Sequence, residues 1–500
     1  MKFPELPAVL VSLLLTVLLT LEPAVGLPAK QTGYISVPLT GVHDKRDPDV
    51  HPDILHQRHV NRGLTRYARL SGRTEPSPLE LLTKMKNRLD SLHPDIRKRY
   101  NHEGIEESIS HLMSINSIFP GAPVPNQAHV SDEGASGYSP SLLAVAVMHT
   151  VTEAKQPGFP STMGLDIQGN ELGYMGHFLL GTPPKTFRLL MDTGSADLWV
   201  GGEDCTAQGG GGCGKHQFLG PKSSSTYNQT DTIWAIRYGS GAVLGHLVYD
   251  RFEVAGLVLE KFFFGVARNE TIQFTPDRIP FDGIAGTARS MISRQRTKTF
   301  VEALYEAGLI KDGIASYKIP RVTTMGVQSD GELTLGAMNP ANYDPATLVT
   351  LSNISPIGFW EVFLQDVKVG GKSIGFTSRN VILDTGTTLF LAPKDDVALL
   401  HRDIPGAIYN GHAWTVPCTT TAVITLNFGG KEFPIDPRDL AFIPLDTRDL
   451  KGNCASAITE VVLHSGQDHW LLGDVFLKNV YFSTNIRTNQ VSIARLPGSQ

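Results

Sequence analysis

The chain has 500 residues, which is more than the roughly 250 to 300 at which a single hydrophobic core usually stops growing, so more than one folding unit is expected. Apolar residues at 41%, charged residues at 19% and 49 glycines describe a globular protein with many turns and exclude a disordered, collagen-like or membrane-embedded chain. The formal net charge of −5 gives no basic footprint for nucleic acid, and four cysteines are too few for a disulfide scaffold or a zinc array.

Charge is distributed unevenly along the chain. Residues 27–100 hold 14 Lys and Arg against 8 Asp and Glu, whereas residues 101–150 hold 5 acidic residues and no basic ones. Residues 151–500 hold 29 basic against 34 acidic residues. Such an asymmetry is more informative than the total, because it separates a basic segment from an acidic body.

The first 26 residues have the pattern of a cleaved secretory signal peptide. An uncharged apolar run extends from Leu6 to Leu21, and the small residues Ala24 and Gly26 follow it. The run is shorter than the roughly 20 apolar residues of a membrane-spanning helix, and no later run or C-terminal tail suits a stable membrane anchor. We therefore expect a secreted, extracellular protein, with an acidic vacuole-like or lysosome-like compartment as the alternative.

Secretion makes glycosylation and disulfides possible. The Asn-x-Ser/Thr tripeptides at Asn228, Asn269 and Asn353 are candidate glycan acceptors. Four cysteines allow three pairings, and we favour Cys205–Cys213 and Cys418–Cys454 because each pair then closes a local loop; free buried cysteines are the alternative. No Cys-x-x-Cys or Cys/His cluster indicates a metal site, and no cofactor is expected.

From about residue 160 the sequence consists of short β-rich runs separated by Gly, Asn and Pro, a spacing typical of an all-β architecture. The expected strands include residues 176–181, 187–191, 232–238, 252–254, 262–266, 333–335, 362–364 and 423–426. The clearest expected helix covers residues 298–307, where Phe300, Leu304 and Ala307 share one face.

An internal repeat explains the length of this part of the chain. Two apolar residues precede Asp-Thr-Gly-Ser/Thr at residues 192–195 and again at residues 384–387. Gly286 follows Asp192 by 94 residues, Gly473 follows Asp384 by 89, and each glycine comes after apolar residues. The pattern predicts two diverged copies of one β-lobe.

Two carboxylates at matching strand ends indicate hydrolytic chemistry. If the lobes pack about a pseudo-two-fold axis, Asp192 and Asp384 meet where the lobes join. Carboxylates held so close cannot both ionise easily, so one keeps a proton. The ionised group can then take a proton from a water while the protonated group donates to a carbonyl oxygen. The shared proton belongs to the pair and cannot be assigned to one aspartate.

From about residue 160 to its end the chain resembles the pepsin-family aspartic endopeptidases, especially secreted fungal ones. Five segments carry the resemblance in order: residues 187–200, 238–241, 281–286, 383–388 and 471–476. The resemblance implies an all-β, bilobal pepsin-like fold with the cleft between two pseudo-two-fold-related lobes, which we place at residues 159–340 and 341–500. It also implies protein and peptide substrates, statine-type inhibitors and a monomer.

The family further implies roles for residues around the aspartates. Thr193 and Thr385 would interlock beneath the dyad, while Ser195 and Thr387 would bind the outer carboxylate oxygens; Gly194 and Gly386 complete the two turns. The hairpin Tyr238-Gly239-Ser240-Gly241 resembles the flap that closes over bound peptide, and Trp199 resembles the hydrogen-bond partner of its tyrosine. Ala196 and Asp197 stand where many relatives have Ser-Asn, so Asp197 either perturbs the dyad or points to solvent.

By the same resemblance, residues 27–158 form a propeptide. A basic segment over an acidic cleft is held by charge at neutral pH and loosens as carboxylates protonate. Lys98 or Arg99 beside Tyr100 resembles the basic-Tyr pair that some zymogens place against the dyad, although Arg97-Lys98-Arg99 also suits a dibasic-cleaving protease, and a solvated linker is the third possibility. The apolar run 141–148 has no assigned role.

We therefore predict a secreted aspartic endopeptidase that is made as a zymogen and acts at acidic pH. One alternative is a catalytically dead relative that binds peptides, which the presence of both aspartates opposes. The other is an actin-type phosphotransferase, because residues 384–388 resemble a phosphate-binding turn. The secretion signal, the second copy of the motif and the missing adenine-site glycines oppose that alternative.

Overall fold

Short strands in four sheets make up most of the fold. The computed structural model describes residues 51–70, 75–94, 97, 151–168, 171–208, 210–238, 241–271, 274–275, 277, 279–322, 328–376, 378–446, 449, 451–461 and 469–498. All of them belong to one compact unit, Thr40–Gln500. The signal-peptide region 1–26, the Lys98-Arg99-Tyr100 triplet and the apolar run 141–148 lie outside the described residues.

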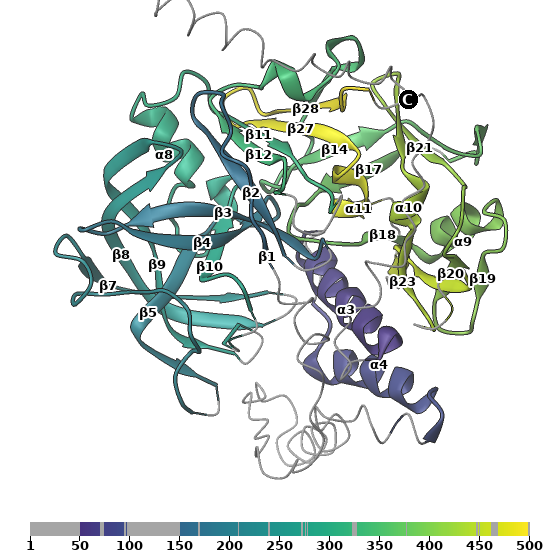
Figure 1. Ribbon diagram of the computed structural model, residues 1–500, viewed down its shortest axis with the longest axis horizontal. Helices are drawn as coiled ribbons and strands as arrows, with labels where there is room; N and C mark the ends of the chain where they lie inside the picture. The colour runs from purple at the N-terminus through teal and green to yellow at the C-terminus, as the bar shows by residue number, and fades with distance from the viewer. Residues whose placement is uncertain are drawn as a thin grey trace, which may run out of the picture. The chain divides into compact units, whose positions relative to one another are not determined.

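The largest sheet joins the two halves of the chain (Figure 1). Its strands in spatial order are β13 (Val349–Ser352), β28 (Gln490–Arg495), β27 (Val480–Asn485), β11 (Ile314–Lys318), β12 (Gly331–Leu335), β2 (Thr162–Gln168), β3 (Gly173–Leu180), β4 (Lys185–Asp192), β10 (Gly283–Gly286), β5 (Leu198–Ala207), β9 (Leu257–Glu270), β8 (Ala242–Val254) and β7 (Asn228–Arg237), with β1 (Val151–Thr152) on β2 and β6 (Phe218–Leu219) on β5. Ala315 of β11 pairs with Thr484 of β27. Backbone pairing therefore joins strands from both sides of the boundary that we expected at residue 340.

The other three sheets lie in the C-terminal half. One has the order β14 (Glu361–Leu364), β17 (Arg379–Leu383), β26 (His469–Leu472), β18 (Phe390–Pro393) and β25 (Ile458–Val461). The next has the order β16 (Lys372–Ser373), β15 (Asp366–Val369), β21 (Ile424–Phe428) and β22 (Lys431–Ile435). The last has the order β19 (Ile408–Tyr409), β20 (Trp414–Pro417), β24 (Asn453–Ser456) and β23 (Ala441–Pro444). The predicted all-β class is confirmed.

Helices in the described residues are few. They are α3 (Pro52–Leu70), α4 (Pro78–Asp90), α8 (Phe300–Glu306), α9 (Lys394–Arg402), α10 (Pro437–Leu440) and α11 (Asp474–Leu477), with 3₁₀ turns η1 (Ser290–Ile292), η2 (Pro340–Asn342) and η3 (Pro345–Thr347). The predicted helix at 298–307 is confirmed as α8, which begins with a capping box between Thr299 and Glu302. The three longer helices, α3, α4 and α9, were not predicted.

The two halves repeat one arrangement around each Asp-Thr-Gly turn. Parallel pairing joins β4 to β10, with Met191 opposite Ala285, and joins β17 to β26, with Leu383 opposite Leu472. A third strand pairs antiparallel with the second one in each half, β5 on β10 and β18 on β26. The internal repeat in the sequence therefore corresponds to a repeated three-strand unit whose first strand leads into the aspartate.

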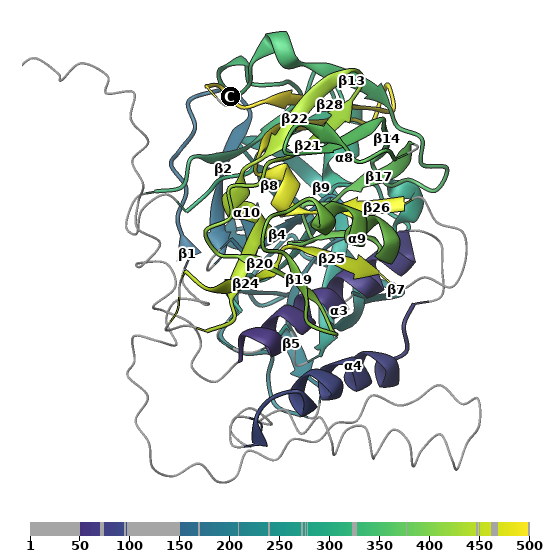
Figure 2. The same ribbon diagram turned by 90° about the vertical axis from the view of Figure 1, so that its right-hand side faces the viewer.

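Helix α3 lies between the two halves, and α4 packs against it on the outer side (Figures 1 and 2). Most residues of α3 are buried, including the polar His56, Asn61 and Arg66. Its apolar residues do recur at helical spacing, because Val60, Leu64 and Tyr67 lie in one apolar cluster with the C-terminal half. The sequence analysis did not identify α3, because polar residues outnumber apolar ones in this segment.

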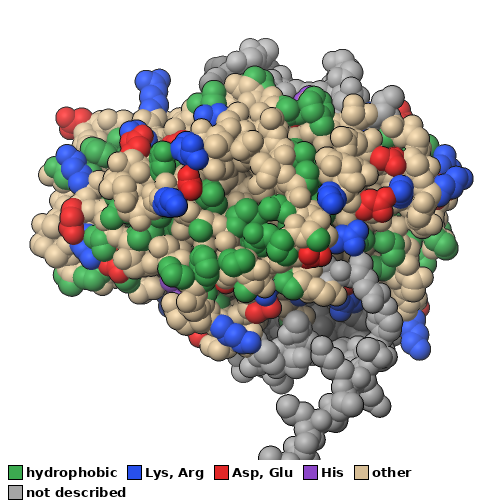
Figure 3. Space-filling model, turned by 90° about the horizontal axis from the view of Figure 1, so that it is seen from above, with side chains coloured by type: hydrophobic (Ala, Val, Ile, Leu, Met, Phe, Trp, Pro, Cys, Tyr) green, Lys and Arg blue, Asp and Glu red, His purple; other side chains and the backbone are tan. Residues whose placement is uncertain are grey.

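The surface gives no single dominant feature on the face seen in Figure 3, where basic and acidic side chains are interspersed and hydrophobic ones gather near the middle. Within the described residues, no helix is both long enough and apolar enough to cross a membrane.

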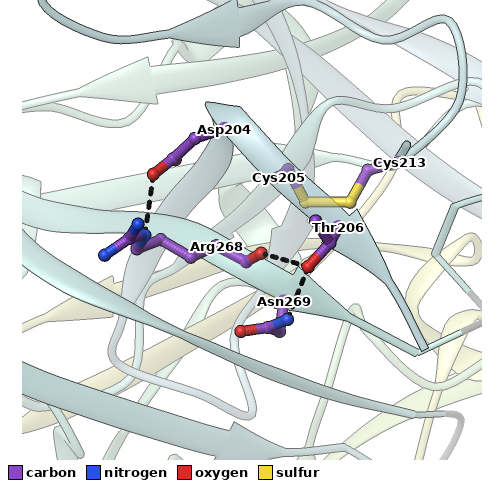
Figure 4. Close-up of a disulfide and its surroundings, with 6 residues drawn as sticks. All are labelled: Asp204, Cys205, Thr206, Cys213, Arg268 and Asn269. Carbon is purple, nitrogen blue, oxygen red and sulfur yellow. Dashed lines mark hydrogen bonds and ion pairs between the residues drawn. A yellow bond between two sulfur atoms is a disulfide. The ribbon is translucent and has the colours of Figure 1, made fainter. Parts of the chain in front are cut away.

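Both disulfides have the expected pairing, Cys205–Cys213 and Cys418–Cys454. Figure 4 shows the first beside two polar links between β5 and β9: Asp204 pairs with Arg268 at 2.7 Å, and the amide of Asn269 donates to Thr206 Oγ1 at 2.7 Å. Of the three candidate glycan acceptors, Asn228 and Asn269 are exposed. Asn353 is buried, and its amide nitrogen donates to Asn489.

The two disulfides should contribute unequally to stability. Replacing Cys418 and Cys454 with Ser opens a loop of sequence separation 36, whereas the Cys205/Cys213 pair spans 8. Loop-closure entropy predicts losses of about 4 and about 2.5 kcal/mol respectively. Thermal unfolding of the two double variants should show the larger fall in Tm for the Cys418/Cys454 pair, and the reverse order would contradict an entropic origin.

Candidate active site

Two Asp-Thr-Gly turns meet at the junction of the halves and bind each other reciprocally. The backbone N–H of Thr193 donates to Thr385 Oγ1 at 3.1 Å, and the N–H of Thr385 donates to Thr193 Oγ1 at 3.0 Å. Each hydroxyl then donates across the junction, Thr193 to Leu383 O at 3.0 Å and Thr385 to Met191 O at 3.1 Å. The four bonds are related by the pseudo-two-fold axis, and both threonines are buried.

The carboxylates of Asp192 and Asp384 are held in matching environments. The N–H of Gly194 donates to Asp192 Oδ1, and that of Gly386 donates to Asp384 Oδ1, both at 2.9 Å. The Ser195 hydroxyl donates to Asp192 Oδ2, and the Thr387 hydroxyl to Asp384 Oδ2, both at 2.6 Å. Neither carboxylate has any exposed surface.

The glycine of each turn is required by close packing across the axis. A Cβ atom on Gly194 would lie 2.6 Å from Asp384 Oδ1, and one on Gly386 would lie 2.6 Å from Asp192 Oδ1. Real Cβ atoms do not approach oxygen so closely, so a larger residue at either position would separate the aspartates. The Asp-Thr-Gly sequence is thus determined by the partner turn as well as by the local backbone.

Arg66 of α3 occupies the space between the two aspartates. Its Nε donates to Asp384 Oδ2 at 2.6 Å, and its Nη2 donates to Asp384 Oδ1 at 3.0 Å and to Asp192 Oδ1. Its Nη1 donates to Gly386 O at 3.0 Å. The next residue, Tyr67, is buried and donates its hydroxyl to His469 O at 2.9 Å. A guanidinium therefore bridges both carboxylates from a segment far away in the sequence.

Burial and charge act in opposite directions here. Burial alone would lower the pKa of Arg66, but the two carboxylates outweigh it and raise that pKa. Burial also raises the pKa of Asp384; the Arg66 charge opposes this rise and the Asp192 charge adds to it. Arg66 therefore stays positively charged and forms ion pairs with both aspartates.

A third carboxyl group lies behind the dyad. Asp474, the residue after Gly473, is buried, and neither of its carboxyl oxygens has a hydrogen-bond partner. Burial raises the pKa of Asp474 well above its usual range, with the Lys478 charge opposing the rise and the Asp384 charge adding to it. Burial therefore disfavours a third negative charge at the site.

The aromatic pair expected above the dyad is present. Trp199 Nε1 donates to the Tyr238 hydroxyl at 2.8 Å, and both residues are buried in one cluster with Phe274 and Phe281. Burial raises the pKa of Tyr238 well above its usual range, which keeps its hydroxyl neutral. Gly239 and Ser240, at the tip of the expected flap, lie outside the described residues.

Asp197 does not point to solvent, which was one of the two expectations. It is 2% exposed, and its carboxylate accepts hydrogen bonds from the Ser293 hydroxyl at 2.6 Å and from the backbone N–H groups of Arg294 and Gln295, both at 3.0 Å. Burial raises the pKa of Asp197. This aspartate anchors the loop that follows η1.

Among the described residues, the basic side chain at the dyad is Arg66, and Tyr67 follows it. Lys98 and Arg99, for which the sequence analysis expected such a contact, lie outside the described residues. A signal for Arg66 was present, because Arg66-Tyr67 is itself a basic-Tyr pair in the same basic block. It was overlooked because Arg97-Lys98-Arg99 is a denser cluster of charge.

Comparison with known proteins agrees with this site. The sequence model of the family described as eukaryotic aspartyl protease matches residues 173–496. The probable aspartic-type endopeptidase CTSD of Arthroderma benhamiae is 33% identical over 342 residues, covering 68% of this chain and 64% of that protein. The aspartic-type endopeptidase ctsD of Aspergillus fumigatus is 31% identical over 69% of this chain and 70% of its own length. Cathepsin D of Dictyostelium discoideum is 31% identical over 64% of this chain and 82% of its own length.

The threonine interlock should stabilise the whole junction. Replacing Thr193 with Val keeps the shape of the side chain but leaves the N–H of Thr385 and the carbonyl of Leu383 without their partner. We expect a loss of about 1 to 3 kcal/mol for each buried unsatisfied group. Thermal unfolding measures it, and Thr193→Ser, which keeps the hydroxyl, is the control. Equal Tm values for the two variants would contradict the assigned contacts.

Proposed function

The chain belongs to the eukaryotic aspartyl protease family, and from that premise we propose that it is an aspartic endopeptidase made as a zymogen. The match to the CTSD relative covers 64% of that protein's length, so activity, substrates and partners are proposals for this chain. The observation that carries the proposal is the pair of buried carboxylates related by a two-fold axis, each with the same N–H and hydroxyl donors.

The reaction needs only the two aspartates and a water. With Arg66 withdrawn, Asp192 and Asp384 share one proton because two adjacent buried carboxylates resist double ionisation. The ionised group takes a proton from the attacking water, and the protonated group donates to the oxygen of the scissile carbonyl. The peptide C–N bond breaks after the tetrahedral intermediate forms, and the amine leaves with a proton from the dyad. This division of roles is the one established for aspartic proteases in general.

Residues around the dyad have supporting roles in this proposal. Ser195 and Thr387 hold the outer carboxylate oxygens, and the threonine interlock fixes the separation of the aspartates. Tyr238, held by Trp199, covers bound peptide together with Gly239 and Ser240 of the flap. The substrates are proteins and peptides, and a statine-type inhibitor should bind the dyad as a mimic of the tetrahedral intermediate.

Latency follows from the position of α3. The helix fills the space between the halves, and the Arg66 side chain occupies the position that water and the scissile carbonyl need. Val60, Leu64 and Tyr67 of α3 pack against apolar residues of the C-terminal half. Those wall residues are Phe359, Ile382, Leu389, Leu391, Val461 and Leu471. We therefore place α3 and α4 in the propeptide within residues 27–158, and we expect apolar substrate side chains to replace those of α3.

The remaining features of the proposal follow from the sequence. A signal peptide at 1–26 and two disulfides fit a secreted protein, with an acidic vacuole-like or lysosome-like compartment as the alternative. Asn228 and Asn269 are the glycosylation sites that we retain, because the side chain of Asn353 is buried and hydrogen-bonded. The chain is proposed to act as a monomer.

Substitution of either aspartate tests the mechanism. Asp192→Asn and Asp384→Asn each remove the shared proton transfer, and general acid–base catalysis is worth about 100- to 10,000-fold, so we expect kcat to fall by about 1,000-fold or more. The measurement is cleavage of an acid-denatured protein between pH 3 and 7, with and without a statine-type inhibitor.

The same measurement gives the pH dependence. Wild-type activity should be maximal in acid and fall as the pair loses its shared proton at higher pH. An Asp192→Asn variant that still cleaves, or a maximum above neutral pH, would refute the aspartic mechanism. Unchanged Tm values for the two variants verify that they are folded.

Removal of the Arg66 side chain tests the latency. Arg66→Ala leaves both carboxylates without their cation, and breaking a buried ion pair weakens an interface by about 3 to 5 kcal/mol. The full chain should then bind an active-site inhibitor and cleave substrate without a lag. Arg69→Ala is the matched control, since Arg69 lies on the same helix but pairs with Glu75 instead. Equal lag times for Arg66→Ala and the wild type would remove Arg66 from the latency.

A further inference from the structure

Three histidines gather where α3 meets the C-terminal half. His56 and His59 come from α3, and His401 comes from α9. Their exposed fractions are 1%, 7% and 1%. None of the three contacts the dyad or enters the proposed chemistry.

Two residues of the C-terminal half, Ser456 and Phe442, link these imidazoles by contacts that they share. Ser456 of β24 contacts two of them, because its carbonyl oxygen lies 3.2 Å from His56 Nε2 and its hydroxyl lies 2.8 Å from His401 Nε2. Phe442 of β23 packs its ring against His59 at a centroid distance of 5.2 Å and against His56 at 6.1 Å. His401 stacks on Trp414 at 4.6 Å. The histidines thus form part of the interface that holds α3 in place.

The charged groups that face His56 and His59 are cationic. Arg58 and Arg62 lie on α3 itself, and Arg88 reaches the cluster from α4. From the C-terminal half the facing groups are the neutral Ser456, Phe442 and His401. The acidic groups Asp53 and Glu460, together with the Tyr409 hydroxyl, interact with Arg88 and raise its pKa against the effect of burial. A protonated imidazole here would gain a buried positive charge beside arginines.

Burial and the Arg88 charge lower the pKa of His56 to about 3, while its contact with Ser456 opposes the shift. Burial, Arg62, His56 and Arg58 lower the pKa of His59 well below its usual range. Burial lowers the pKa of His401 to about 4. All three imidazoles are therefore neutral while α3 is in place at mild pH.

Carboxylates also attract this segment to the enzyme. Arg66 of α3 pairs with Asp192 and Asp384, and Glu460 of the C-terminal half attracts Arg88 of α4. The other described pairs of these helices, such as Arg69 with Glu75 and Lys86 with Asp90, stay within the segment and do not hold it to the enzyme.

We propose that His56 and His59 form the acid-sensitive latch of this segment, so that their protonation releases α3 from the C-terminal half and uncovers the dyad. The inference rests on the proposed zymogen function and adds the regulation of that site. This latch differs from a mechanism in which carboxylates are protonated and lose their ion pairs. Here the closed form is destabilised because the protonated imidazoles would be buried positive charges.

The direction of the pH dependence follows from linkage. A histidine in the released segment has its ordinary pKa near 6.5, whereas in the closed form the pKa is depressed. The closed form therefore has its full stability above about pH 6.5. As the pH falls below that value, the closed-to-open equilibrium constant decreases by up to about tenfold per pH unit for each histidine. Between about pH 6.5 and 4.5 protonation of His56 alone can shift the closed-to-open ratio by about 100-fold, and protonation of His59 shifts it further in the same direction.

Pulsed hydrogen exchange on the full chain tests the latch without requiring peptidase activity. Backbone exchange of residues 52–70 is followed from pH 7 to 4 in pulses of seconds and corrected for the intrinsic dependence on pH. Wild type should lose protection of α3 below about pH 6.5. The variant His56→Gln/His59→Gln, in which the amide at position 56 can still reach the Ser456 carbonyl and neither side chain can become charged, should keep α3 protected. We expect at least about 100-fold less opening at pH 4.5.

The control is His177→Gln, which changes a histidine of β3 that pairs with Asp166 of the same lobe and should open like the wild type. If the double variant opens at the same pH as the wild type, the latch is refuted. If the double variant is already open at pH 7, the single variants carry the test, and each should lose about half of the pH dependence. A histidine-dependent opening without any proteolysis would leave the latch standing and refute the proposed peptidase.

Discussion

The reciprocal hydrogen bonds between Thr193 and Thr385 are the contact on which the site depends. Each threonine uses its hydroxyl both to accept from the other turn and to donate to the strand that leads into it. Because these N–H and hydroxyl groups are buried, each would lose stability if its hydrogen-bond partner were missing. Formation of one turn therefore depends on formation of the other. The separation of Asp192 and Asp384 is set by this contact and by the absence of a Cβ atom at the two following glycines.

The same symmetry explains how one guanidinium can bridge both aspartates. Two carboxylates with identical donors present a concentrated negative charge, and Arg66 matches it from a single helix. Helix α3 is buried on most sides although it carries many polar residues. A permanent core helix would not be built this way, whereas a segment that later enters solvent needs polar side chains that satisfy one another while it is docked.

The uneven charge of the chain thus has a structural counterpart. The basic block contains Arg66, which meets the dyad, and Arg62 and Arg88, which face the histidines on the other side of the same interface. Histidines placed among arginines make that interface stable only while they are neutral. In the proposed regulation, Arg66 holds α3 on the dyad and His56 and His59 release it, so different residues of one helix carry out the two tasks.

The sequence by itself determined the elements whose causes are local or repeated. Short windows of sequence encode the strands, the capped helix after Thr299 and the duplicated Asp-Thr-Gly motif. The all-β class, the two halves and the two aspartates were predicted from these windows. Only the tertiary structure shows that Arg66 meets the dyad, that Asp197 is buried, and that the sheet crosses from β11 to β27. Such features depend on which distant surfaces meet, and no short window of sequence contains both surfaces.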